Sequence, residues 1–259
     1  GYGYPPRTHV FDELFAYDPA ADCWEVLTRM PFPRCYGGIA ELRGKTWIVG
    51  GAANLAAAAD PDGPREPLAD VRIYDPESGA WAEGPPLAHR RLEPVVVQAQ
   101  GRIWAIGGSD GASPLTCVES IGAGDRDWRN EAPMPWPQSQ ADGCVMSGLI
   151  YCMSRAGLLC FDPQAGTWDT SLPQLAESPQ AAQVVAFGER IWVMGGSRRR
   201  DTNIYDPATA TWKRGPDLPT DNSWGAALVL TATLVIAGGA HWSERHQRYF
   251  FDDRVLALR

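Results

Sequence analysis

The chain has 259 residues, of which 44% are hydrophobic and 21% are charged, a balance typical of a globular protein with a sizeable core. No apolar run approaches the roughly 20 residues of a membrane-spanning helix, so the sequence excludes such a segment. A net charge of −8 argues against general nucleic-acid binding, which needs a broad basic face. The 27 Gly, 22 Pro and 11 Trp residues favour short strands and tight turns over helices.

The six cysteines are too few for a disulfide framework at this length, and none has the spacing of a zinc site. Cys144, Cys152 and Cys160 lie in successive apolar runs, so we expect them to be small buried hydrophobic residues. Whether Cys23 and Cys35 form a disulfide stays open. This usage favours a reducing, cytoplasmic location. Because the chain does not begin with Met and shows no signal-like segment, we expect a processed or excised piece.

An aromatic residue followed by Asp-Pro recurs along the chain, each time with a tryptophan seven residues after the aromatic residue. The aromatic residue and tryptophan pairs are Tyr17 and Trp24, Tyr74 and Trp81, Phe161 and Trp168, and Tyr205 and Trp212. Ile121 and Trp128 keep the spacing without the Asp-Pro. Asp can accept hydrogen bonds from the backbone ahead of it, and Pro presets φ for a turn. The pattern therefore predicts a strand, a tight turn and a second strand that carries the tryptophan.

A second feature alternates with the first: an apolar run closed by two glycines. The pairs are Gly50-Gly51, Gly107-Gly108, Gly195-Gly196 and Gly238-Gly239. Glycine at these strand ends permits a positive φ and lets neighbouring backbones approach closely. The run Leu149–Met153 occupies the equivalent place but is followed by Ser154-Arg155. Two alternating features of this kind are the signature of an internal repeat.

Each repeat is predicted to contain four strands. A first apolar run turns at a single glycine, and the second strand ends at the glycine pair. The third strand ends at Asp-Pro, and the fourth carries the tryptophan. A four-stranded repeat of this size cannot bury both faces alone, so neighbouring repeats must pack against each other.

These motifs resemble the kelch family of β-propellers, and the resemblance covers nearly the whole chain. It implies an all-β, kelch-type β-propeller of four-stranded antiparallel blades. Val255–Leu258 matches the third strand at Leu14–Tyr17, which leaves both ends incomplete. We expect six blades, with five as the alternative, in a single domain of residues 1–259. The repeats span about 1–33, 34–88, 89–137, 138–177, 178–221 and 222–259.

The loops between second and third strands vary in length and composition, and such loops on a rigid repeated framework commonly carry binding. One of these loops contains Arg198, Arg199 and Arg200. The corresponding loop of the next repeat contains His241, Trp242, Arg245, His246 and Arg248, and Arg7 and His9 would follow if the ring closes. Arginine recognises carboxylates bidentately, so this basic arc favours an acidic peptide or protein segment. The alternative is that these arginines are solvated and paired with Asp201 and Glu244.

Arg34, Arg90 and Arg91 open first strands, and kelch proteins that recruit partners commonly use basic residues at such positions. We therefore include them among the predicted partner-binding residues, with a salt bridge to a neighbouring blade as the alternative for each. Trp136 and Trp224 occupy equivalent positions, either as exposed anchors or packed beneath a loop.

Enzymatic kelch relatives provide two further comparisons. A copper oxidase of the galactose-oxidase type needs a set of His and Tyr ligands that the four histidines of this chain do not match, so we predict no metal site. Six-bladed sialic-acid mutarotases need an arginine beside acid–base groups, for which Arg34, Arg90 and Glu93 are the candidates. No nucleophile elbow, P-loop or zinc-protease motif is present.

The sequence therefore predicts a protein-interaction module whose loop-rich rim binds an acidic protein segment. We expect no catalytic activity, no cofactor, and no binding of nucleic acid or membrane. Resemblance to the propellers of BTB-kelch proteins implies a role as the substrate-recruiting part of a ubiquitin-ligase adaptor. The alternative is a sugar-binding or sugar-isomerising propeller similar to the mutarotases.

Overall fold

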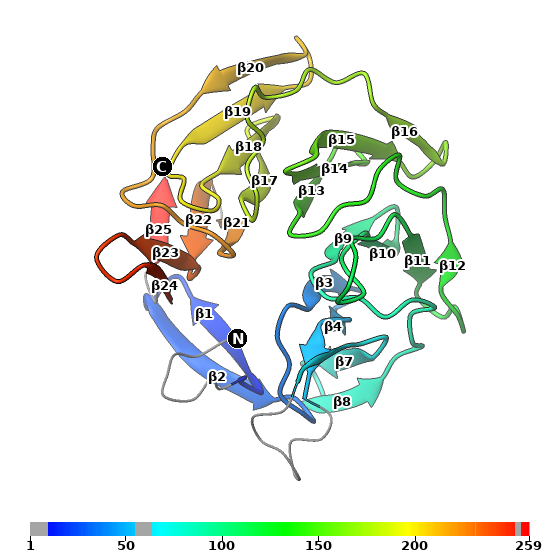
Figure 1. The fold of residues 1–259 in the computed structure, drawn as a ribbon. Helices are drawn as coiled ribbons and strands as arrows, with labels where there is room; N and C mark the ends of the chain where they lie inside the picture. Colours follow the sequence, from blue (N-terminus) through cyan, green and yellow to red (C-terminus); the bar gives the residue numbers. More distant parts are fainter. Residues whose placement is uncertain (1–9, 55–63, 231, 252–254, 259) are drawn as a thin grey trace. The chain divides into compact units, whose positions relative to one another are not determined.

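The computed structural model describes residues 10–54, 64–230, 232–251 and 255–258, and these form 25 β-strands. The chain divides into two compact units. Unit 1 comprises Gly1–Leu115 and Glu119–Asn130, and unit 2 comprises Thr116–Val118 and Glu131–Arg259. Within each unit the main sheets have four antiparallel strands that follow one another in chain order (Figure 1). Among the described residues, no helical segment has the length and hydrophobicity that crossing a bilayer requires.

Unit 1 contains two four-stranded sheets and two separate pairs of strands. The first sheet consists of β3 (Gly38–Leu42), β4 (Lys45–Val49), β7 (Val71–Asp75) and β8 (Ala80–Glu83). The second consists of β9 (Val95–Ala99), β10 (Arg102–Ile106), β11 (Val118–Gly122) and β12 (Arg129–Asn130). Two further pairs are β1 (Glu13–Asp18) with β2 (Cys23–Arg29), and the short strands β5 (Ala52–Ala53) with β6 (Glu66–Pro67).

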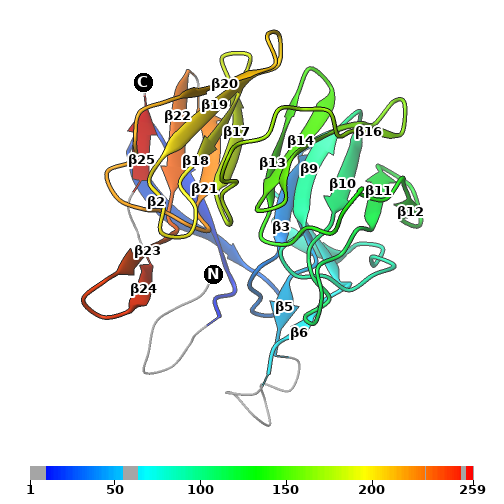
Figure 2. The same ribbon diagram turned by 45° about the horizontal axis from the view of Figure 1, so that its top comes forward.

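Unit 2 contains two four-stranded sheets and one of three strands. The first is β13 (Asp142–Met146), β14 (Leu149–Ser154), β15 (Gly157–Asp162) and β16 (Thr167–Asp169). The second is β17 (Gln183–Phe187), β18 (Arg190–Met194), β19 (Thr202–Asp206) and β20 (Thr211–Arg214). The third is β21 (Ala226–Leu230), β22 (Thr233–Ala237) and β25 (Val255–Leu258). Between β22 and β25, a separate hairpin of β23 (Ala240–Ser243) and β24 (Arg248–Phe251) projects away from this sheet (Figure 2).

The repeated aromatic residue and tryptophan face each other across the third and fourth strands. Tyr74 lies directly opposite Trp81, with ring centroids 5.2 Å apart, and Tyr205 lies opposite Trp212 in the same way. The side chain of Asp75 accepts hydrogen bonds from the backbone N–H groups two and three residues ahead, which closes the turn. The seven-residue spacing in the sequence is therefore the length of one third-to-fourth-strand hairpin.

All eight residues of the four glycine pairs have positive φ angles, as predicted. At Gly51, where φ is 98°, a Cβ atom would lie 2.6 Å from the carbonyl oxygen of Cys35, so no other residue fits there. The repeat without a glycine pair has a different connection between its second and third strands. Ser154 lies opposite Gly157, so β14 and β15 are joined by a tight turn that needs no glycine pair.

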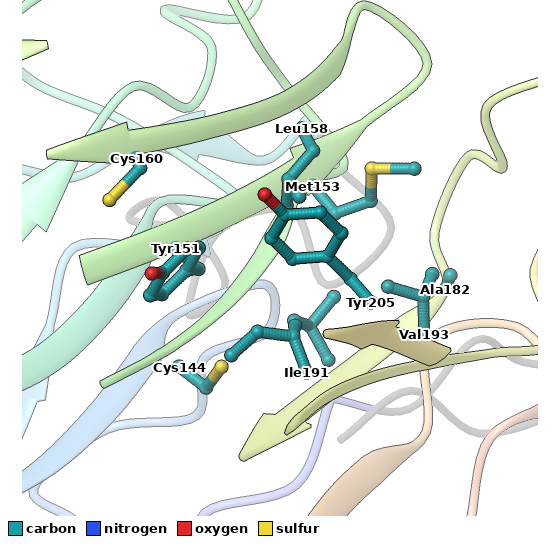
Figure 3. Close-up of a cluster of buried hydrophobic side chains, with 10 residues drawn as sticks. Cys144, Tyr151, Met153, Leu158, Cys160, Ala182, Ile191, Val193 and Tyr205 are labelled. Carbon is teal, nitrogen blue, oxygen red and sulfur yellow. The ribbon is translucent and has the colours of Figure 1, made fainter. Parts of the chain in front are cut away.

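The core of each unit lies between successive sheets. In unit 2, Tyr151 and Met153 pack with Ile191 and Tyr205 of the next sheet (Figure 3). Cys144, Cys152 and Cys160 are buried in unit 2, and burial raises the pKa of each thiol. The prediction that they are small hydrophobic core residues is confirmed. Cys23 and Cys35 are both free thiols, so they form no disulfide.

The predicted all-β fold of four-stranded antiparallel sheets is confirmed, and each predicted repeat contains one sheet or part of one. Five sheets have three or four strands, while β1 and β2 correspond to the third and fourth strands of a further repeat. The first and the last of these sheets therefore have fewer than four strands among the described residues. The single domain and the six-blade count stay predictions. Arg7 and His9 lie outside the described residues.

Candidate partner-binding site

Two loops of unit 2 that the sequence singled out meet in the structure. The loop between β18 and β19 places the Arg198 guanidinium carbon 3.8 Å from the centre of the Trp242 ring, in cation–π geometry. Trp242 lies on β23, in the connection between β22 and β25. We call the surface formed by Arg198, Trp224, Trp242 and Tyr249 the Arg198–Trp242 surface.

Hydrogen bonds from the preceding segment hold the β23–β24 hairpin in place. Ser223 and Ala240 form an isolated antiparallel bridge, with N–H to O distances of 2.9 and 2.8 Å. The backbone N–H of Trp242 donates to the Asp221 carboxylate at 2.7 Å. The position of the Trp242 ring is therefore fixed by the backbone rather than by side-chain packing alone.

The two faces of the hairpin carry different aromatic groups. On one face, the Tyr249 ring contacts both Trp242 and Trp224 edge-on, at centroid distances of 5.0 and 5.1 Å. The side chain of Trp224 is 40% exposed, so this face presents an aromatic ring to solvent. On the other face, Phe250 is flanked by His241 and His246, and Arg248 lies over its ring at 4.7 Å.

The three successive arginines have different electrostatic environments. Arg199 forms a two-pronged ion pair with Asp201, with both N–O distances 2.8 Å, and also contacts Glu177. Arg200 pairs with Asp217 at 3.3 Å. Burial would raise the pKa of Asp201, but hydrogen bonds from Arg199 and Asn203 outweigh it and lower the pKa.

Arg198 and Arg245 differ from these two arginines because neither forms an ion pair within the described part of the chain. Arg198 also has a φ of 58°, a backbone conformation that a long side chain rarely adopts. The indole Nε1 of Trp242 is buried and has no acceptor among the described residues. The exposed Arg198 guanidinium is thus the hydrogen-bond donor that this surface offers to an anionic group, while the Trp242 ring supplies apolar area beneath it.

Arg34 and Arg91 are buried, at 3% and 0% exposure, which corrects the prediction that they contact a partner. Each guanidinium forms an ion pair within its own sheet, Arg34 with Asp70 and Arg91 with Glu119. Burial lowers the pKa of Arg34, although the hydrogen bond that Arg34 donates to Asp70 opposes that shift.

A repeated structural role explains both arginines. Arg34 donates to the carbonyl of Gly50 at 3.1 Å, and Arg91 donates to that of Gly107 at 3.2 Å. In unit 2 the amide of Asn222 donates to the carbonyl of Gly238 at 2.9 Å in the same way. In three of the four glycine pairs, this repeat position therefore binds the first glycine, and its side chain is structural.

Arg90 and Trp136, also singled out from sequence, have different environments. Arg90 is 67% exposed and lies 3.8 Å from Glu66, so it remains accessible on unit 1. Trp136 is partly buried, and its Nε1 finds no acceptor among the described residues. Neither residue belongs to the Arg198–Trp242 surface.

Two of the four histidines lie on the β23–β24 hairpin. His241 and His246 both lie against Phe250, and neither belongs to a group of three or more possible metal ligands within the described residues. His9 lies outside the described residues.

Sequence reasoning missed Tyr249, Phe250 and Asp221, which shape and position the hairpin. The signal was present in two short segments that contain aromatic residues, 240–243 and 248–251, on either side of a polar turn, which is a pattern typical of a β-hairpin. Asp221 gives no such signal, because its contact with the Trp242 backbone depends on the path of the loop.

Residues 33–88 match the family described as Kelch motif. The chain is 25% identical to Kelch-like protein 35 of Mus musculus over 233 residues, and 29% identical to Kelch repeat and BTB domain-containing protein 8 of Xenopus tropicalis over 161 residues. These matches cover 86% and 60% of this chain, but 38% and 27% of the relatives. The chain thus spans well under half the length of the curated relatives it matches.

The solved structure of YjhT has a similar fold, with a TM-score of 0.75 over 92% of this chain and 88% of that chain, at 14% sequence identity. This identity is too low to carry more than the fold. The four-stranded sheets, the repeated glycine pairs and the Kelch motif match agree with one another. The chain therefore has the β-propeller fold, and its residues 33–88 carry a Kelch motif.

Proposed function

We propose that this chain is a protein-interaction module that binds an acidic segment of a partner protein at the Arg198–Trp242 surface. The observation that carries the proposal is the contact between Arg198 and Trp242, which come from the corresponding loops of two successive repeats. Tryptophan and arginine are the residue types that most often dominate binding energy at protein interfaces.

The charges around the surface support an acidic partner. Arg199 and Arg200 are neutralised by Asp201 and Asp217, whereas Arg198 has no carboxylate partner among the described residues. A partner carboxylate that accepts from the exposed Arg198 guanidinium would form the ion pair that Arg198 lacks among the described residues. The net charge of −8 makes such a basic spot a local feature that directs acidic groups to one place.

A finer proposal is that the module recruits substrates to a ubiquitin ligase in the cytoplasm. One relative is named as a kelch repeat and BTB domain-containing protein, and several others are Kelch-like proteins. Because this chain matches less than half of their length, the role of a whole relative comes to this chain only as part of the proposal.

The geometry does not favour the alternative of a sugar-processing propeller. Such a site needs an accessible arginine beside acid–base groups. Arg34, one of the candidates, is buried and paired with Asp70, and Arg90 points to an exposed Glu66. We therefore propose no catalytic activity.

The test is a pull-down followed by mass spectrometry, at low and at moderate salt, with wild-type protein, Arg198→Glu and Arg200→Glu. Arg200 is the matched control because it lies in the same loop, is 61% exposed and already has an acidic partner. We expect partners that are retained by wild type and Arg200→Glu, lost with Arg198→Glu, and weakened by salt. Equal partner sets for wild type and Arg198→Glu, with folding intact by circular dichroism, would contradict the proposal.

A further inference from the structure

The exposed large hydrophobic residues of unit 1 are concentrated in its first three strands and the segments beside them. They are Phe11, Phe15, Trp24, Val26, Leu27, Tyr36 and Ile39, all between 41% and 57% exposed. Phe15 lies on β1, and Trp24, Val26 and Leu27 lie on β2. An apolar surface of this extent on a folded protein marks an interaction site.

The complete sheets show which strands pair with a third strand and so define what β1 lacks. The third strands β7, β15 and β19 each pair with a second strand on one edge and a fourth strand on the other. Strand β1 corresponds to them but pairs only with β2 among the described strands. The edge where a second strand would pair is therefore open on β1.

On the adjoining sheet, Ile39 of β3 is exposed, although Ile48 of β4 on the same face is buried. Ile39 lies opposite Ile48, just as Val184 lies opposite Val193 in unit 2. Val184 is 3% exposed because it packs against the preceding sheet, whereas Ile39 is 57% exposed. A pocket lined by residues that include Met30 and Tyr36 opens beside Ile39.

The indole N–H of Trp81 gives independent evidence that the sheet of β1 and β2 is incomplete. The indole Nε1 groups of Trp128 and Trp212 donate to the carbonyls of Pro85 and Pro173, which follow the fourth strand of the preceding sheet. The equivalent Nε1 of Trp81 is buried but has no acceptor among the described residues. The segment after β2 is therefore not in the position that the same segment takes in the other sheets.

We infer that β1, β2 and the adjoining face of β3 and β4 form a docking surface for an antiparallel β-hairpin, whose strands take the first-strand and second-strand places of this sheet. The repeat defines the chemistry of that hairpin: two strands of about five residues with alternating apolar side chains, closed by a pair of glycines. Strand addition to an open edge supplies backbone hydrogen bonds, and the exposed apolar residues supply burial.

The probe is a fluorescein-labelled peptide with the sequence of residues 183–196, which is the first hairpin of a complete sheet with its glycine pair. Fluorescence anisotropy measures its binding to the full chain. We expect saturable binding that weakens at least about tenfold in Phe15→Glu and in Ile39→Glu, because each variant places a carboxylate at an apolar contact. Both residues are more than half exposed, so neither variant should impair folding.

Val229→Glu is the matched control, since Val229 is an exposed apolar residue of unit 2 at 39% exposure. Its affinity for the peptide should equal that of wild type. The Trp81 indole N–H resonance, identified by its loss in Trp81→Phe, should move downfield when the peptide binds, because seating β2 gives it an acceptor.

Three results would overturn the inference. The first is no saturable binding, and the second is unchanged affinity in both Phe15→Glu and Ile39→Glu. The third is self-association of the chain that light scattering detects, that Phe15→Glu abolishes and that the peptide does not inhibit, because the occupant would then be a second copy. This inference is independent of the Arg198–Trp242 surface, so failure of either proposal leaves the other standing.

Discussion

Arg91 in unit 1 and Arg198 in unit 2 show how one residue type serves two purposes in the same fold. Arg91 is fully buried, pairs with Glu119 and donates to three backbone carbonyls. Arg198 lies over Trp242 and has no carboxylate partner among the described residues. The difference follows from repeat position: Arg91 shares its role with Arg34 and Asn222, whereas Arg198 performs no role that the other repeats also need.

The largest expected loss of stability comes from replacing the buried Arg91. Replacing Arg91 by Ala leaves the Glu119 carboxylate buried without its cation, which costs about 3–5 kcal/mol in a protein interior. Urea unfolding of Arg91→Ala should show that loss, while Arg90→Ala, at an exposed site, should stay within about 0.5 kcal/mol of wild type. Equal stability of the two variants would remove the structural role assigned to Arg91.

Asp142 sharpens the comparison because it is a partly buried acid that forms no ion pair with an arginine among the described residues. Burial raises its pKa to about 6 from an ordinary value of 3.8, although hydrogen bonds from the Val184 and Gly143 N–H groups oppose the shift. The folded state therefore holds the proton more tightly than the unfolded state. Its stabilising contribution is complete below about pH 4 and is lost as the pH rises through about 6.

Between about pH 4.5 and 7.5, the free energy of unfolding of wild type should fall by about 1–3 kcal/mol relative to that of Asp142→Asn. Urea titrations of both proteins at the two pH values measure this difference. Parallel pH dependence of wild type and Asp142→Asn would show that Asp142 does not titrate in this range.

A smaller effect is expected at Arg199, whose side chain is 28% exposed and forms a two-pronged ion pair with Asp201. Arg199→Ala should lower the free energy of unfolding by about 1 kcal/mol, since a geometrically fixed pair at a partly buried site is worth more than a surface pair. Arg200→Ala, which removes a single exposed contact, should cost less than about 0.5 kcal/mol. A larger loss in Arg200→Ala than in Arg199→Ala would reverse this ranking.

The smallest effect on stability is expected at Arg198 itself. Arg198→Gly removes the cation–π contact but also relieves the positive φ of 58°, and these opposing contributions are each about 0.5–1 kcal/mol. Thermal unfolding of this variant should therefore match wild type, while binding at the Arg198–Trp242 surface is lost. Marked destabilisation would assign Arg198 a structural role like that of Arg91.

Much of the fold could be predicted from sequence because its determinants are local. The seven-residue spacing of Tyr74 and Trp81 is one hairpin long, and glycine at Gly51 is required by a close backbone approach. Whether an arginine is buried depends instead on long-range contacts. Arg34 and Asp70 are far apart in sequence, so no local pattern predicted that they would form an ion pair.

The candidate site could be predicted only in part. The sequence indicated the two loops that meet at Arg198 and Trp242, because repeats place corresponding loops at corresponding positions. It did not show that Arg199 and Arg200 would be neutralised by Asp201 and Asp217, since side-chain pairing depends on loop geometry. Nor did it show that Trp224 would contact Tyr249 edge-on.

Selection of a displayed random-peptide library on the wild-type chain and on Arg198→Ala tests the proposed binding most directly. We predict that wild type enriches peptides rich in Asp and Glu, and that individual enriched peptides bind Arg198→Ala about 30-fold more weakly, the effect of losing a contact worth about 2 kcal/mol. Their affinity should also fall with rising salt. Enrichment without acidic residues, or equal affinity for Arg198→Ala, would contradict recognition of an acidic segment at this surface.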